Sequence, residues 1–162
     1  MNIREGLHMP TEASLFLQCH IPILQAWVNG LQTIEGMQQA LGKSHETIRR
    51  LRQQVASVME VGVGKDRIAK AVIYTTVHNL VNFDVIDQIR PKRAFTDRET
   101  NILTSMAMGL DNQQIAVHLS IKPDELKAGK RDILDNLGVN SPYTALAWGI
   151  HRSIQRLQRQ NG

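Results

Sequence analysis

The sequence contains one cysteine and few aromatic residues, and each shortage excludes a class of protein. A single thiol, Cys19, among 162 residues allows neither a disulfide framework nor a cluster of thiolate ligands for zinc. Aromatic residues make up only 4% of the chain, while hydrophobic residues as a whole make up an ordinary 42%. This balance fits small helical units that are filled by aliphatic side chains. We expect an all-α protein that holds no metal ion and no other cofactor.

Long apolar runs and a signal-peptide pattern are also missing. The longest apolar run is too short to span a bilayer, and residues 1–5 do not resemble a signal peptide. We therefore expect a cytoplasmic protein with no membrane partner. Enzyme chemistry is not indicated either, because no carboxylate pair sits in an apolar setting and the 6 histidines are scattered. The protein is not expected to be an enzyme.

The chain divides at a short basic segment near its middle, Ile89-Arg90-Pro91-Lys92-Arg93-Ala94. Pro91 interrupts the helical periodicity, and cations cluster around it. We predict an N-terminal helical domain over residues 1–88, a linker over 89–94 and a C-terminal domain over 95–162. Lys92 and Arg93 are expected to contact phosphates, although a solvated basic hinge explains them equally well. The net charge of +4 and a pI near 9.5 are compatible with a nucleic-acid partner.

The C-terminal domain carries the signals of four short helices. Thr96-Asp97-Arg98-Glu99 is a capping box that begins the first helix. Asp111 begins a second helix over residues 112–119, and Pro123 suits the first position of a third. Ser141-Pro142 opens a fourth. Apolar residues recur at helical spacing in all of them, which predicts a compact trihelical unit with a flanking helix.

Several stretches of this domain carry a family resemblance. They are Phe95-Thr96-Asp97-Arg98-Glu99, Gly109-Leu110-Asp111-Asn112-Gln113-Gln114-Ile115-Ala116, Ile133-Leu134-Asp135-Asn136-Leu137-Gly138-Val139 and Ala145-Leu146-Ala147-Trp148-Gly149-Ile150. Together they resemble the C-terminal helix-turn-helix domain of LuxR/FixJ/NarL-type regulators, over about residues 92–158. Region 4 of sigma factors is similar, but the Leu-Gly-Val and Ala-Leu-Ala-Trp strings favour the first family. The resemblance implies that a third helix, at about residues 123–136, enters the major groove.

The same resemblance implies which residues touch DNA and which pair two subunits. DNA contacts fall on Lys127, Ala128 and Arg131, with Lys130 beside them, and the three cations share one face of the helix. Asn112 and Lys122 are expected to contact the duplex as well. The fourth helix is expected to form a homodimer interface through four residues, Tyr143, Leu146, Ala147 and Ile150.

The third helix also departs from the family pattern. Glu125 and Leu126 stand where the family usually has Thr and Val, and Gly129 replaces the usual His or Tyr. Glu125, Asp132 and Asp135 oppose phosphates, and a glycine inside a helix costs about 1 kcal/mol relative to alanine. These departures leave open a helix-turn-helix that is kept as a scaffold for protein contacts.

Residues 34–58 of the N-terminal domain allow two interpretations. Their apolar residues fit a heptad pattern, which predicts a continuous coiled-coil helix that dimerises the chain. Alternatively, Gly42 ends one helix and Ser44 caps another, so that helices over 34–41 and 45–59 flank a tight turn. The string from Gln39 to Arg50, within about residues 33–58, resembles the helix-turn-helix of DeoR-type regulators. That resemblance implies a second DNA contact through Ser44, His45, Thr47, Arg49 and Arg50.

Three functions are compatible with these patterns. The leading prediction is a sequence-specific transcription regulator that binds double-stranded DNA as a homodimer, with RNA polymerase or another regulator as a further partner. The alternative is a protein-interaction module, a regulator partner or anti-activator, whose degenerate helix-turn-helix no longer reads DNA. A small-molecule sensor in the N-terminal domain is indicated only by Trp27, Tyr74 and His78. A phosphate-accepting receiver domain is not indicated, because residues 1–90 read as helical throughout.

Overall fold

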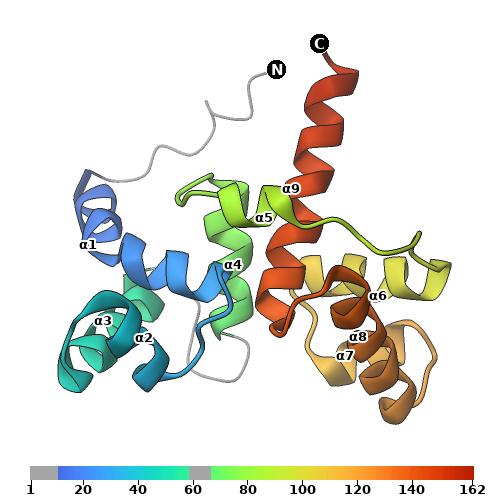
Figure 1. Ribbon diagram of the computed structural model, residues 1–162, viewed down its shortest axis with the longest axis horizontal. Coiled ribbons are helices and arrows are strands. Elements are labelled where there is room, and N and C mark those ends of the chain that lie inside the picture. Colours follow the sequence, from blue (N-terminus) through green and yellow to red (C-terminus); the bar gives the residue numbers. More distant parts are fainter. Residues whose placement is uncertain (1–10, 59–66) are drawn as a thin grey trace.

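The computed structural model describes residues 11–58 and 67–162, with side chains from His20 onward. These residues form helices and no strands, which confirms the all-α prediction (Figure 1). The helices are α1 (Thr11–Val28), α2 (Ile34–Leu41), α3 (His45–Val58), α4 (Arg67–Val77), α5 (Asp84–Gln88), α6 (Asp97–Ala107), α7 (Asn112–His118), α8 (Pro123–Leu137) and α9 (Pro142–Gln160). Within the described ranges, no helix has the length and apolar character needed to cross a membrane.

Helices α2 and α3 are separate, so the prediction of a continuous coiled-coil helix over residues 34–58 is wrong. Gly42 ends α2 with a left-handed φ of 62°, a conformation that glycine adopts without steric strain. The Ser44 hydroxyl then caps α3 by accepting a hydrogen bond of 3.2 Å from the Thr47 amide. Helix α1, in contrast, continues through Pro22 to Val28 and changes direction along its length (Figure 1).

The N-terminal helices enclose a core of aliphatic side chains around one tryptophan. Ile48 and Val55 of α3, Met37 of α2 and Trp27 of α1 are all buried. Because α1 and α2 both pack on α3, the apolar residues of the heptad pattern point inward within one chain. Met37, Ile48 and Val55 of this pattern are therefore core residues, and its other members are half-buried against the same core.

The C-terminal helices begin and end where the local signals predict. The Thr96 hydroxyl and the Glu99 carboxylate complete a capping box on α6, and Asp111 and Gln114 complete another on α7. Helix α8 starts at Pro123 and ends before Gly138. Helices α6 and α7 both pack on α8, with apolar side chains between them. The buried side chains of this unit include Ile102, Ile115, Leu126, Ile133 and Leu137.

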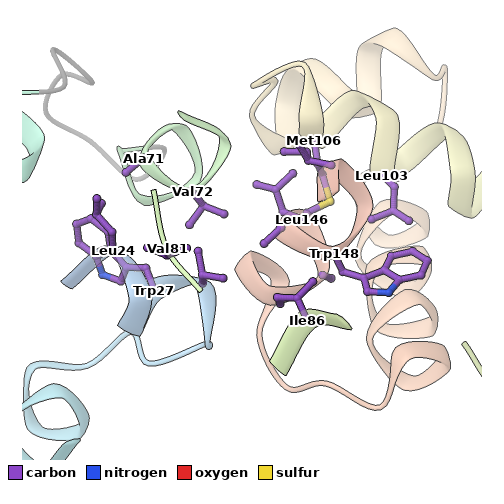
Figure 2. Packing of buried hydrophobic residues seen from close by; sticks show 14 of the residues in the cluster. Leu24, Trp27, Ala71, Val72, Val81, Ile86, Leu103, Met106, Leu146 and Trp148 are labelled. Carbon is purple, nitrogen blue, oxygen red and sulfur yellow. The ribbon is translucent and has the colours of Figure 1, made fainter. Parts of the chain in front are cut away.

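The two halves of the chain meet along α4 and α9, which is the broadest contact between two described helices. Figure 2 shows Val72 of α4 and Leu146 of α9 pointing toward one another across this contact. Two further hydrogen bonds join the start of α9 to α1 and the segment after it. The Thr144 hydroxyl donates to the Val28 carbonyl at 2.9 Å, and the Gln32 amide donates to the Ser141 hydroxyl at 3.0 Å.

Three of the four residues predicted for a homodimer interface on α9 are covered within this one chain. Leu146 is 2% exposed, Ala147 is fully buried and Ile150 is 8% exposed, all within one chain. Only Tyr143 of the four predicted residues is partly exposed. Helices α4 and α1 cover this apolar face of α9, and the homodimer stays a prediction.

Candidate nucleic-acid interface

Helices α7 and α8 form a helix-turn-helix around a short left-handed turn. Ser120 has a φ of 53°, and the Ile121 amide closes the end of α7 with a hydrogen bond of 3.0 Å to the Ala116 carbonyl. Pro123 then occupies the first turn of α8, where its missing amide hydrogen leaves no bond unmade. This turn fixes the angle at which α8 leaves α7.

The predicted reading residues lie on the exposed side of α8. Lys127, Ala128 and Arg131 are exposed, whereas Leu126 and Ile133 face the core. Lys130 is half-buried at the edge of this face and donates a hydrogen bond to the Asn112 side chain at the start of α7. The structure thus brings Asn112, Lys127, Lys130 and Arg131 to one surface.

Glu125, which was expected to oppose phosphates, is used inside the domain. Its carboxylate accepts a 2.7 Å hydrogen bond from the Lys122 amide and lies 3.4 Å from the Arg98 guanidinium. The bond from the Lys122 amide and the charge of Arg98 hold the pKa of this carboxyl below its ordinary value. Part of its negative charge is therefore balanced before any DNA approaches.

Gly129 is a packing residue. A Cβ at this position would lie 2.5 Å from Cδ1 of Ile102 on α6, so the end of the Ile102 side chain would have to move. The position is buried, so the family's usual His or Tyr has no room here unless α6 and α8 move apart. The glycine removes a side chain from the core side of α8 and leaves the exposed side unchanged.

The linker residue Arg93, predicted to contact a phosphate, is paired with α6 while its side chain stays half-exposed. Its guanidinium donates two hydrogen bonds, of 2.9 and 2.6 Å, to the buried carboxylate of Glu99. These bonds, together with the Thr96 amide, lower the pKa of the Glu99 carboxyl. Lys92 remains exposed beside it. The linker is therefore bound to α6 through Arg93. Of its two cations Lys92 and Arg93, Lys92 is the one without an ion pair to α6 and is exposed for contact with DNA.

Asn136 is a site residue that the sequence patterns did not identify. Its side chain accepts a 3.0 Å hydrogen bond from the Arg93 amide and donates one of 3.2 Å to the Arg93 carbonyl. Its own carbonyl accepts from the Lys92 amide at 2.9 Å. A polar residue at a buried helical position was the available signal, because such groups need partners.

An open groove of about 870 Å³ runs between α7 and α8 beside these cations. Ala116, Val117, Ile121 and Leu126 contribute apolar atoms to its lining, while Asn112, Lys127 and Lys130 contribute polar ones. Val117 of this lining is 75% exposed. The reading surface therefore has an apolar part as well as a cationic part.

The predicted second reading helix, α3, also presents cations to solvent. His45, Arg49 and Arg50 are exposed, and Arg49 pairs with Glu46 at 3.2 Å on the surface. The Ser44 and Thr47 hydroxyls lie 2.9 Å apart at the start of the helix, so capping already occupies them. Arg52, one turn further, lies over the buried ring of Trp27 at 5.9 Å.

The residues suggested for a small-molecule sensor are not gathered in one place by any described contact. Trp27 lies in the core beneath Arg52, whereas Tyr74 and His78 of α4 contact one another with ring centroids 4.2 Å apart.

The fold and this surface define a class: the C-terminal half is a trihelical helix-turn-helix unit with a flanking helix, and one side of its third helix is exposed. Residues 93–148 match the model of the family described as bacterial regulatory proteins, luxR family. This finding confirms the resemblance on which the site was predicted.

One curated relative extends the comparison beyond that domain. The chain is 33% identical over 81 residues to a "Nitrate/nitrite response regulator protein homolog" of Haemophilus influenzae. The match covers 49% of this chain and 38% of the relative, so the chain corresponds to well under half of that protein. No solved structure matches the chain.

Proposed function

We propose that this protein is a sequence-specific DNA-binding transcription regulator, with α8 lying in the major groove of its target. The observation that carries the proposal is the exposed pair Lys127 and Arg131 on the reading helix of a luxR-family domain. These two residues stand four apart, so both project from one side of the helix. An arginine on such a helix can donate two hydrogen bonds to a guanine edge, and a lysine can bind a phosphate or a guanine.

We assign contacts with the DNA backbone to four of the remaining predicted residues. Asn112 and Lys130 are already hydrogen bonded to one another at the edge of the surface, where both can reach a phosphate. Lys122 and Lys92 are exposed cations on either side of α8. Phosphate contacts of this kind set the register of the protein on DNA, while contacts to base edges select the sequence.

Selection of bound fragments from a random DNA pool, at two salt concentrations, tests this function. We expect one recurring sequence motif, and we expect Arg131→Ala to lose about 1–3 kcal/mol of binding free energy for that motif. Lys127→Ala should weaken binding more evenly across sequences and reduce its dependence on salt. Arg156→Ala is the matched control, because Arg156 is an exposed cation on α9 outside the helix-turn-helix.

The groove between α7 and α8 favours a second candidate function. Its apolar lining and the exposed side chain of Val117 are suited to a protein segment, as in a regulator partner or anti-activator. If selection recovers no motif and binding is weak at both salt concentrations, the interaction module becomes the better explanation. Val117→Asp should then abolish binding of the partner, whereas Arg131→Ala should have little effect.

A further inference from the structure

Helices α1–α4 repeat the arrangement of α6–α9. In each set the first and second helices pack on the third, and the fourth packs on the first and the third. The second helix starts with the same side-chain cap: the Thr33 hydroxyl accepts from the Gly36 amide at 3.0 Å, and the Asp111 carboxylate accepts from the Gln114 amide at 2.8 Å. The chain therefore contains two helix-turn-helix units of one design.

The spacing of the key positions is identical in the two units. Thr33, Met37, Gly42, Ser44, Ile48 and Val55 correspond in order to Asp111, Ile115, Ser120, Lys122, Leu126 and Ile133. Gly42 and Ser120 both have left-handed φ values, of 62° and 53°. The core members of both sets are buried. Such agreement in turns and burial means that α3 sits in its unit as α8 sits in its own.

The exposed positions correspond as well, and their chemistry differs. Arg49, Arg50 and Gln53 of α3 occupy the places of Lys127, Ala128 and Arg131 of α8, and all six are exposed. Arg52 and Lys130 are both half-buried at the next equivalent place. The ion pair between Arg49 and Glu46 lies on the surface, where such pairs are weak and a phosphate can replace Glu46. Helix α3 therefore offers a second cationic reading face with its own side chains.

The contact between α4 and α9 holds the two units together. In Figure 1, α2 and α3 lie at one end of the molecule and α7 and α8 at the other, with α4 and α9 between them. The apolar face of α9, which in a homodimer would meet a second subunit, meets α4 of the same chain. A folded chain of this length has a diameter of roughly 40 Å, which is comparable with the distance of about 34 Å between successive major-groove faces.

We propose that one copy of this chain binds duplex DNA as a monomer through two reading helices, α3 and α8, and that its site consists of two unlike half-sites. This proposal rests on the function proposed above and adds the second reader and the stoichiometry. The half-sites are unlike because Arg49, Arg50 and Gln53 present different groups from Lys127, Ala128 and Arg131. The proposal is thus an alternative to a homodimer that binds a palindromic site with one chain on each half-site.

The test uses the full chain and the site recovered by selection. Three double variants each remove two exposed cations: Arg49→Ala with Arg50→Ala on α3, Lys127→Ala with Arg131→Ala on α8, and Arg156→Ala with Arg159→Ala on α9 as the control. We expect one chain per duplex by light scattering of the complex. Each reading-helix variant should bind roughly 10-fold or more weakly and lose nuclease protection over one half-site, a different one in each case. The control should keep both half-sites protected.

A change in the DNA provides a check that does not depend on folding of the variants. Inserting about five base pairs, half a helical turn, between the half-sites should weaken binding at least 10-fold, because the α4–α9 contact fixes the two readers. Wild-type affinity and a full footprint for the α3 variant, with weakened binding by the α8 variant, would overturn the single-chain proposal and leave the proposed function standing. Two chains on a palindrome would overturn it as well. If the α8 variant also binds normally, the proposed function itself fails.

Discussion

Gly129 lies on the side of α8 that faces Ile102 of α6, and a single methyl group there would test the packing. Alanine in its place would gain up to about 1 kcal/mol of helix propensity, but its Cβ would lie 2.5 Å from Cδ1 of Ile102. Overpacking of a core costs about 1–3 kcal/mol, so we expect Gly129→Ala to lower the free energy of unfolding by about 1 kcal/mol. Denaturant unfolding followed by circular dichroism measures this change.

Ile102→Val supplies the control for that prediction, because it removes the Cδ1 atom that the new methyl would meet. When Gly129→Ala is combined with Ile102→Val, we expect it to stabilise the protein by a few tenths of a kcal/mol or more. If Gly129→Ala destabilises the protein equally with and without Ile102→Val, then contact with Ile102 is not the reason for a glycine at this position.

Glu99 gives the domain a predictable response to acid. Hydrogen bonds from Arg93 and from the Thr96 amide lower the pKa of its buried carboxyl in the folded state. In the unfolded chain this carboxyl has an ordinary pKa of about 4.3. Its contribution to stability is therefore complete above that pH and is lost as the pH falls through the lower, folded-state pKa.

We expect Glu99→Gln to lower the free energy of unfolding at pH 7 by about 1–3 kcal/mol, the range for hydrogen bonds to charged groups. The variant should also show a shallower loss of stability below about pH 4.3. Asp97→Asn, an exposed carboxylate in the same first turn of α6, is the matched control. Parallel pH profiles for wild type and Glu99→Gln would contradict the assigned role of the Arg93–Glu99 pair.

Local signals predicted these residues well only where their partners are close in the sequence. The capping box of Thr96 and Glu99 spans three residues and could be read directly. The bond from Arg93 to Glu99 spans six residues but requires the linker to fold back, which Asn136 of α8 brings about. From the sequence alone, Gly129 was interpreted as a residue that destabilises α8. Its packing against Ile102 of α6 could not be predicted from the residues around it.

At the scale of elements, the turn between α2 and α3 separates the two interpretations that periodicity left open. The same apolar residues satisfy a heptad pattern and a pair of short helices, so the pattern by itself could not decide. Gly42 has a left-handed φ of 62°, and a Cβ added to it would meet nothing within 4 Å, so only its backbone conformation disfavours a side chain. A left-handed conformation costs a residue with a Cβ about 1–2 kcal/mol.

We therefore expect Gly42→Ala to lower the free energy of unfolding by about 1 kcal/mol. Ser44→Ala should lower it by about 0.5–2 kcal/mol through loss of the α3 cap. Both substitutions would instead stabilise a continuous helix, where alanine is the best residue. In urea unfolding, the change in the free energy of unfolding therefore has opposite signs for two separate helices and for one continuous helix. Lys43→Ala, at an exposed position in the same turn, is the control for an unspecific effect of substitution.

At the scale of the whole molecule, the burial of α9 by the N-terminal half could not be predicted from either half. The bond from Thr144 to Val28 joins residues that are 116 apart in the sequence. The apolar face of α9 fits a homodimer and an internal contact equally well, because both require the same stripe of buried residues. Only the presence of α4, with its own apolar face, decides between them.

We expect this contact to make the two halves one cooperative unit, and the chain carries a reporter in each. Trp27 lies in the core of the N-terminal unit and Trp148 in that of the C-terminal unit, and they are the chain's 2 tryptophans. Variants with Trp27→Phe or Trp148→Phe therefore report one half at a time by fluorescence. We expect both reporters to give the same melting temperature, because a small single unit unfolds in one transition.

Ile48→Val then tests whether the halves are coupled. Ile48 is fully buried in the N-terminal unit, and loss of one methyl group from a core costs about 0.5–1.5 kcal/mol. A chain of this length should melt about 2–4 °C lower for each kcal/mol, and we expect the Trp148 signal to shift by as much as the Trp27 signal. Ile133→Val, at the place in α8 equivalent to Val55 of α3, should shift the Trp27 signal in the same way. If each substitution moves only the reporter in its own half, the units fold independently, and the α4–α9 contact is too weak to hold two reading helices at a fixed spacing on DNA.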